Sequence, residues 1–144
     1  MAAVWHTCCM AIQLSVTLRN AGLDAYEVAV GTSAVLKIRT GAQPADVATA
    51  DSGTVLATLS LPSDWMAAAA SGAKAKAGTW EDAAADATGT AAHYRIYASD
   101  GTTPHLQGSV TATGGGGDMT VDNVSLAAGQ QFIVTSYSWT AANA

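Results

Sequence analysis

The sequence is poor in charged side chains, and its few basic residues limit what the protein can bind. Its 144 residues include six Lys and Arg against eleven Asp and Glu, so the formal net charge is -5. Nucleic-acid binding requires clustered Lys and Arg that neutralise phosphates. No basic stripe is present in the sequence, and we therefore expect no nucleic-acid partner.

Long apolar runs are also missing. No stretch approaches the roughly 20 residues that a membrane-spanning helix needs. Residues 1–10 lack the charged start and apolar middle of a secretory signal. We expect a soluble chain with no membrane partner and no export signal.

Cysteine occurs only as the adjacent pair Cys8 and Cys9. A disulfide between neighbouring residues is strained and rare, so the pair predicts no disulfide scaffold. His6 lies close by, but these three side chains lack the loop spacing of a structural zinc site. We expect no metal and no cofactor. We interpret residues 1–11 as an N-terminal arm held by another subunit, and residues 12–144 as a single domain.

Large apolar side chains are scarce. Hydrophobic residues make up 49% of the chain, but many are alanine and phenylalanine occurs once. Small residues bury little area each, so the core contributes less hydrophobic stabilisation than one rich in Leu, Ile and Phe. This composition suggests a domain whose stability is supplemented by association.

The pattern of residues 12–30 predicts one helix, ended by Gly31. At about 100° per residue, one narrow apolar stripe, which we expect to face the domain's own core, contains Leu14, Leu18, Ala21, Ala25 and Val28. A polar flank contains Gln13, Asn20, Asp24 and Glu27. A second apolar side, opposite the first, contains Val16, Leu23 and Val30. Exposed single apolar residues are common, but a second apolar side also fits a helix held between its own sheet and a neighbouring subunit. The predicted subunit or capsid contacts are Val4, Trp5, Val16, Leu23 and Val30.

After the helix, the hydrophobic period changes to two, which is typical of strands. The predicted strands are residues 36–40, 55–61, 73–81, 93–98, 106–112, 118–126 and 130–139. Alternating apolar residues at 130–139 suggest that this last strand is covered on both sides. About seven or eight short strands, joined by Gly, Asp and Pro turns, predict a mainly β fold. We expect an antiparallel β-sandwich or jelly roll preceded by one N-terminal α-helix.

No set of residues indicates catalysis. Asp82 and Asp86 lie among alanines in a predicted loop, without the cleft that acid–base chemistry needs. His93 and His105 fall on one hairpin without a third ligand, and we interpret them as sheet-surface residues. No serine lies in a nucleophile elbow. We expect no enzyme, no catalytic residue and no small-molecule substrate.

Several segments resemble small virion structural proteins of tailed bacteriophages. The segments are LSVTLRNAGLDAYEVAVG leading into LKIRTGAQPAD, then VLATLSL, ADATGTAAHYRIYASDGT and SLAAGQQFIVTSYSW. The similarity lies in the composition and order of the segments, and MAAVWHTCC departs from the usual start. The resemblance implies a head decoration or cement protein, which is a non-enzymatic β-sandwich on the capsid surface, often a trimer. Its partners would be the major capsid protein and copies of itself.

Two other functions stay open at this point. A tail, neck or fibre component would have the same composition. A carbohydrate-binding sandwich would need an exposed aromatic platform. The candidates for such a platform are Trp65, Trp80, Tyr94, Tyr97, Tyr137 and Trp139, although core packing explains most of them better.

Overall fold

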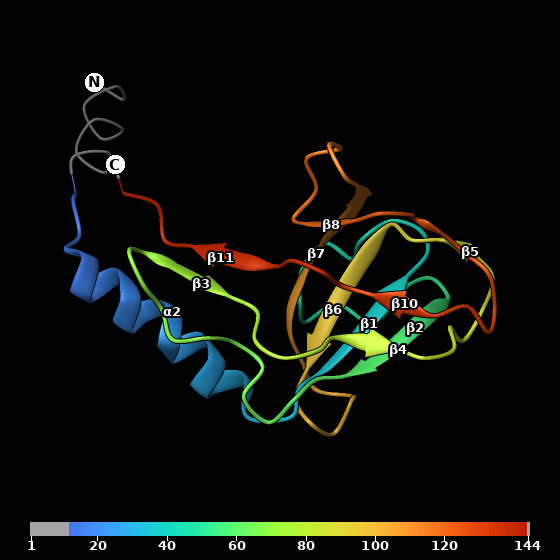
Figure 1. The fold of residues 1–144 in the computed structure, drawn as a ribbon, viewed down its shortest axis with the longest axis horizontal. Coiled ribbons are helices and arrows are strands. Elements are labelled where there is room, and N and C mark those ends of the chain that lie inside the picture. Colours follow the sequence, from blue (N-terminus) through green and yellow to red (C-terminus); the bar gives the residue numbers. More distant parts are fainter. Residues whose placement is uncertain (1–11, 144) are drawn as a thin grey trace.

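The computed structural model describes residues 12–143 and is mainly β, as predicted. Within these residues, one helix, α2 (Val16–Val30), precedes eleven short strands. The strands are β1 (Val35–Arg39), β2 (Val55–Ser60), β3 (Ala73–Ala75), β4 (Glu81–Asp82), β5 (Gly89–Thr90), β6 (His93–Tyr97), β7 (Pro104–Ala112), β8 (Met119–Val121), β9 (Ser125–Leu126), β10 (Phe132–Ile133) and β11 (Ser138–Thr140). Their curled sheets form a β-sandwich-like domain (Figure 1).

The largest sheet has five strands in the order β2-β1-β6-β7-β8. β1 pairs antiparallel with β2 and with β6, and β6 and β7 form the hairpin that the sequence predicts. β8 departs from the expected antiparallel arrangement because it pairs parallel to β7. Three two-stranded sheets, β10-β4, β11-β3 and β5-β9, complete the fold.

The helix begins and ends where its local sequence dictates. The Ser15 hydroxyl accepts a hydrogen bond from the Leu18 N–H at 3.2 Å, which satisfies one of the donors left free at a helix start. Gly31 follows the last turn with φ of 91°, a conformation that favours glycine, and its N–H donates to the Glu27 carbonyl.

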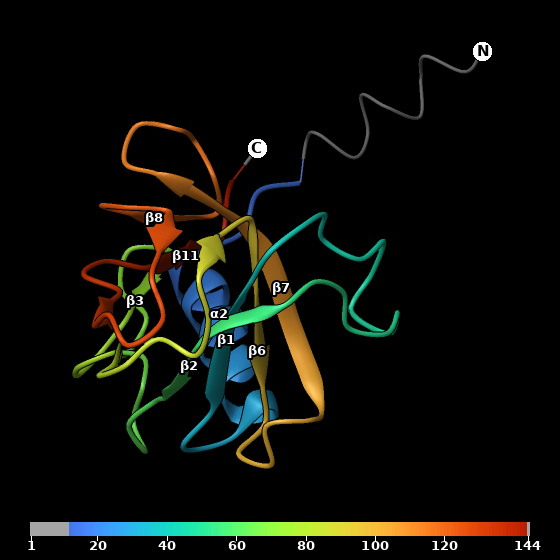
Figure 2. The same cartoon turned by 90° about the vertical axis from the view of Figure 1, so that its right-hand side faces the viewer.

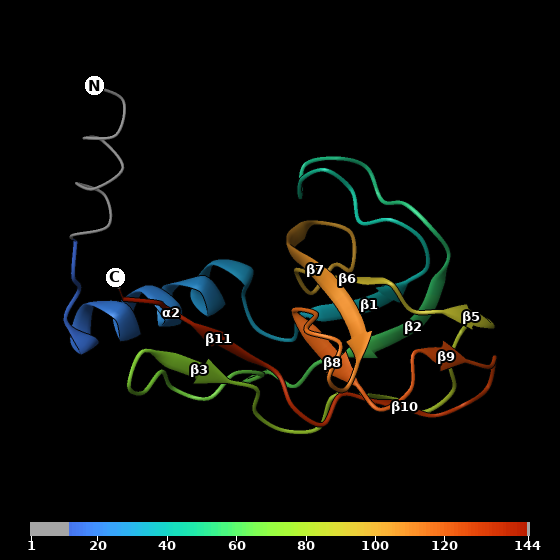
Figure 3. The same ribbon diagram turned by 90° about the horizontal axis from the view of Figure 1, so that it is seen from above.

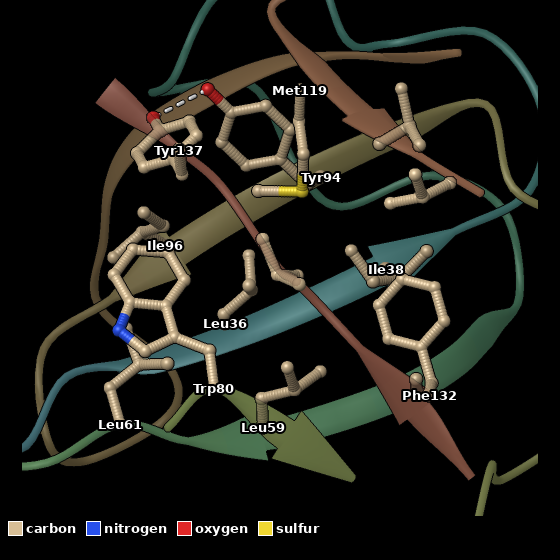
Figure 4. Packing of buried hydrophobic residues seen from close by; sticks show 14 of the residues in the cluster. Leu36, Ile38, Leu59, Leu61, Trp80, Tyr94, Ile96, Met119, Phe132 and Tyr137 are labelled. Carbon is tan, nitrogen blue, oxygen red and sulfur yellow. Dashed lines mark hydrogen bonds between the residues drawn. The ribbon is translucent and has the colours of Figure 1, made fainter. Parts of the chain in front are cut away.

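One face of β6 builds the hydrophobic core. Tyr94 and Ile96 lie beside Leu36 and Ile38 of β1, and aromatic rings from the later segments pack over them (Figure 4). The Tyr94 and Tyr137 hydroxyls are hydrogen-bonded at 2.7 Å, and the two rings meet edge to face. The core is therefore held by interlocked aromatic side chains as well as by small ones.

Residues 40–54 cover the opposite face of β6. Arg95 is 1% exposed, and its Nη1 lies 2.6 Å from Asp51 Oδ1. Arg39 Nη2 lies 2.6 Å from the other oxygen of the same carboxylate, and Tyr97 donates its hydroxyl to Asp51 at 2.8 Å. Arg95 also donates to the Thr49 carbonyl. A loop is thus fixed over the sheet by ion pairs and hydrogen bonds to two buried arginines.

The helix occupies one end of the molecule. In Figures 1 and 3, α2 lies with β3 and β11 at one end, and the five-stranded sheet lies at the other. Seen along the long axis, α2 lies behind the strands of the sheet (Figure 2). One side of the helix consequently faces away from the rest of the described chain.

Three predicted strands are interrupted. The segment 73–81 divides into β3 and β4, the segment 118–126 into β8 and β9, and the segment 130–139 into β10 and β11. In the last of these, Val134 and Tyr137 are both buried although they are three residues apart. A continuous strand would turn such residues to opposite faces. The strand is broken between them, and Ile133, Thr135 and Ser136 are exposed. The prediction of one strand covered on both sides is therefore wrong.

Candidate functional site

Three polar residues of α2 bind a neighbouring segment of the protein through their side chains. Each accepts a hydrogen bond from a backbone N–H in the segment 66–72, which runs beside the helix. The pairs are Asn20 with Gly72 at 2.8 Å, Asp24 with Ala69 at 3.0 Å, and Glu27 with Met66 at 3.2 Å. These three side chains, hereafter the polar side of α2, supply acceptors to an irregular segment that lacks a continuous strand partner. Buried backbone groups must be paired, so this polar side dictates how the helix docks.

A buried lysine reinforces the polar side. Lys74 of β3 is 2% exposed, and its Nζ lies 2.6 Å from Asp24 Oδ1 and 2.8 Å from Glu27 Oε2. Burial alone would lower the pKa of Lys74, but hydrogen bonds and charge from the two carboxylates outweigh burial and raise it. The hydrogen bond from Lys74 is also the main cause of the lowered pKa of Asp24. Lys74 is therefore charged at neutral pH and ties β3 to the helix.

The docking leaves an apolar side of the helix exposed. We call the exposed residues Leu18, Ala21, Ala25 and Val28 the outer face of α2. Leu18 is 57% exposed and Val28 is 81% exposed. Leu14, just before the helix, is also exposed, and none of these five side chains carries charge or a hydrogen-bonding group. An exposed apolar face of this kind typically marks an interaction surface.

The predicted orientation of the helix is wrong. The stripe expected in the core is the outer face, whereas Leu23 and Val30, expected on the outer side, are 2% and 8% exposed and pack inside. The physical cause is the polar side, because its acceptors must reach the backbone of residues 66–72 and so rotate the opposite stripe outward. Val16 remains exposed, at 47%, at the start of the helix.

The other predicted contacts lie elsewhere. Val4 and Trp5 fall outside the described residues. Tyr26, which sequence reasoning missed, is 60% exposed and meets the Trp139 ring edge to face at a centroid distance of 6.0 Å. The 3-4-3 apolar spacing from residue 18 to residue 28 identifies a stripe on the helix, but the same spacing fits a core-facing side and an exposed side.

A shallow groove lies beside the outer face, where the helix meets the sheet. Its volume is about 460 Å³, and α2, the start of β7 and β11 form its walls. Leu23, Tyr26 and Val30 line it from the helix, and Leu106 and Trp139 line it from the strands. The groove is mostly apolar, and α2 contributes residues both to it and to the outer face.

The aromatic residues considered for a carbohydrate platform are not presented as one. Trp65, Trp80, Tyr94, Tyr97 and Tyr137 are buried, and Trp139 is half-buried beneath Tyr26. Trp65 and Trp80 donate their ring N–H groups to the backbone carbonyls of Gly31 and Ala77. Packing in the core accounts for most of these rings, as the sequence suggested, whereas Tyr97 lies on the other face of β6 and binds Asp51.

The two histidines do not form a pair. His93 is 0% exposed and lies opposite Ser109 in the hairpin, so its prediction as a sheet-surface residue is wrong. Its Nδ1 lies 3.0 Å from the Gly41 carbonyl oxygen. Burial lowers the pKa of His93, and the charges of Arg39 and Arg95 act in the same direction. His105 is exposed.

The described residues were compared with the requirements of a metal site and of a membrane-spanning helix. Within residues 12–143, no group of three or more His, Cys, Asp or Glu side chains is placed to hold a metal ion. His6, Cys8 and Cys9 lie outside that range. Among the same residues, no helix combines the length and apolar character needed to cross a bilayer.

Comparison with known proteins adds no relative. No family model, no curated protein and no solved structure matches the chain.

Proposed function

We propose that this protein is a non-enzymatic virion structural protein of a tailed bacteriophage, a decoration or cement protein that binds the capsid surface and stabilises the head shell. The observation that carries the assembly part of this proposal is the exposed, uncharged outer face of α2. The bacteriophage part comes from the resemblance of the sequence segments. The proposed partners are the major capsid protein and copies of the chain itself, most simply as a trimer.

The arrangement of polar and apolar side chains on α2 supports an assembly role. A helix that serves only its own domain turns its polar residues to solvent and its apolar residues inward. In α2, Asn20, Asp24 and Glu27 bind the backbone of residues 66–72, while Leu18 and Val28 are exposed. Leaving apolar side chains in water lowers the stability of the isolated chain, and covering them with a partner recovers that stability.

The proposed mechanism is additive. Each copy contributes contact area across the shell, and any contact that exists only in the assembled shell shifts the equilibrium toward the assembled state. Many weak contacts on one particle act together because binding at one site raises the effective concentration at the next. The shell would then resist heat and internal pressure without any chemical step.

The test is the location and copy number of the protein in purified virions. Quantitative mass spectrometry should find it in numbers comparable with the major capsid protein, and cryo-electron microscopy should place it on the outer surface of the head. A ring or fibre with few copies at the tail or neck would replace the proposal by a tail, neck or fibre function. Absence from the particle would refute both.

A further inference from the structure

His93 is a buried histidine that holds one end of the loop 40–54. It is the first residue of β6, and its Nδ1 is hydrogen-bonded to the Gly41 carbonyl oxygen at 3.0 Å. A carbonyl oxygen can only accept, so Nδ1 carries the proton of the neutral ring and Nε2 carries none. Nε2 is also buried, and no group within residues 12–143 forms a hydrogen bond with it. A second proton on this ring would go to Nε2, where it finds no acceptor.

Positive charges beside His93 oppose this second proton. Arg39 lies opposite His93 on β1, and Arg95 lies two residues further along β6. Both arginine side chains are buried, and they share the single carboxylate of Asp51. Burial is the main cause of the lowered pKa of His93, and the two arginines lower it further, whereas Asp51 acts in the opposite direction. A protonated His93 would be a third buried cation beside one carboxylate.

The strand on the other side of His93 supplies no acceptor either. Ser109 of β7 lies opposite His93, and its N–H and hydroxyl both donate to Asp118. These hydrogen bonds lower the pKa of Asp118, which is therefore charged in mild acid. Asp118 forms no hydrogen bond with His93 in the described chain, so it does not pair with a proton on Nε2.

The acidic groups of the loop keep their charge when the pH falls to about 5. Burial alone would raise the pKa of Asp51, but hydrogen bonds, first from Tyr97, outweigh burial and lower it. Hydrogen bonds from Thr49 lower the pKa of Asp46. Arginine stays charged throughout, whereas histidine ordinarily titrates near pH 6.5. Mild acid therefore changes the charge of His93 and leaves the charges around it unchanged.

The loop 40–54 is the layer that can move away from His93. It covers the face of β6 that carries His93, Arg95 and Tyr97, and it is held by polar contacts to Asp51, Thr49 and Gly41. No residue of the loop belongs to the buried hydrophobic cluster on the other face of the sheet. The loop can therefore open while the core stays packed, which is the condition for a local opening of low free energy.

We propose that protonation of His93 opens the loop 40–54 in mild acid, so that this loop is a pH-sensitive flap over one face of β6. Opening lets water bind the proton on Nε2 and releases the strain of a third buried cation. The open form binds the proton more readily than the closed form does. The ratio of open to closed form consequently rises as the pH falls below about 6.5, by up to about tenfold per pH unit. This flap is independent of the proposed virion function.

Hydroxyl-radical footprinting of the full-length chain at about pH 7.5 and 5.5 tests the flap. Two buried tyrosines of β6 report on its two faces, because Tyr97 lies beneath the loop and Tyr94 lies in the core. Oxidation of Tyr97 should rise by up to about tenfold at the lower pH, while oxidation of Tyr94 should not change. His93→Gln keeps an N–H for the Gly41 carbonyl but does not titrate, so it should abolish the rise. The matched control is His105→Gln, which replaces an exposed histidine of β7 and should respond as wild type does.

Three results would overturn the flap. These are equal oxidation of Tyr97 at both pH values, an undiminished rise in His93→Gln, and an equal rise at Tyr94, since the whole domain then opens. If His93→Gln does not fold, nuclear magnetic resonance of the wild-type chain decides. The titration of the His93 ring and the change in the Thr49 amide signal should share one midpoint, and two separate midpoints would refute the coupling.

Discussion

Two leucines on α2 should differ strongly in how much stability is lost when each is replaced with alanine. Leu23 is 2% exposed and Leu18 is 57% exposed, although they lie five residues apart on one helix. Replacing each with alanine removes the same atoms and leaves a good helix former at both positions. The difference between the two variants therefore reports burial alone.

The size of the effect follows from the surroundings of each leucine. Removing a buried leucine side chain costs about 2–5 kcal/mol of stability, and the cost rises with the cavity left behind. Leu23 borders the groove beside the helix, so water can enter the vacated space, and we expect the lower part of that range, about 2–3 kcal/mol. For Leu18→Ala we expect a change within about 0.5 kcal/mol in the isolated chain.

Urea denaturation at several protein concentrations measures both effects. Leu23→Ala should lower the free energy of unfolding at every concentration. The free energy of unfolding of an associating protein rises with protein concentration, because association stabilises the folded chain. Leu18→Ala should remove only this concentration-dependent increase. If Leu18→Ala destabilises the dilute protein as much as Leu23→Ala does, the assignment of the two sides of the helix is refuted.

Three further predictions concern the buried polar groups, each measured by chemical or thermal denaturation. Lys74→Met should lower the urea midpoint far more than Lys76→Met, because it leaves two neighbouring carboxylates without their cation; equal midpoints would contradict this role. Tyr94→Phe should lower the free energy of unfolding by about 1 kcal/mol, because it removes one hydrogen bond. Tyr137→Phe should lower it by more, because the Tyr137 hydroxyl also accepts a hydrogen bond from Trp139; the reverse order would contradict this hydrogen-bond network. The lowered pKa of His93 means that the unfolded chain binds a proton more readily, so stability is fully present above about pH 6.5 and falls as the pH decreases. His93→Gln should flatten the decrease in melting temperature between about pH 7.5 and 5.5, and an unchanged slope would contradict it.

Much of the fold is visible in the sequence because local chemistry determines it. Ser15 and Gly31 set the ends of the helix, and the alternation of residues 93–98 predicts β6 correctly. The hairpin partner β7 follows from the turn at Asp100 and Gly101, where the Asp100 carboxylate accepts backbone hydrogen bonds. These features depend only on residues near one another in the chain.

The orientation of α2 depends on distant residues and could not be predicted in the same way. The sequence gives no indication that the backbone of Met66, Ala69 and Gly72 will lie beside the helix and need acceptors. An amphipathic pattern shows that a helix has two different sides, but the rule that the apolar side faces inward assumes an isolated domain. The proposed partner of α2 would break that assumption.

The breaks in the predicted strands also depend on residues that are distant in the sequence. Alternation in residues 130–139 is regular in the sequence, yet the pairing partners change along it, from β4 at Phe132 to β3 at Trp139. The chain must bend between two small sheets, and the bend lets Val134 and Tyr137 face the same core. Sheet partners are set by the whole topology, so the break is invisible in the local pattern.

Sedimentation velocity of Leu18→Asp beside the wild-type chain tests the central claim, that the outer face of α2 is an assembly surface, most directly. The wild-type chain should sediment as an oligomer whose population rises with concentration. Leu18→Asp should sediment as a folded monomer, while Ala128→Asp, which adds the same charge at an exposed position far from the helix, should behave as wild type. A wild-type chain that stays monomeric at every concentration, or a Leu18→Asp variant that assembles as wild type does, would contradict the account.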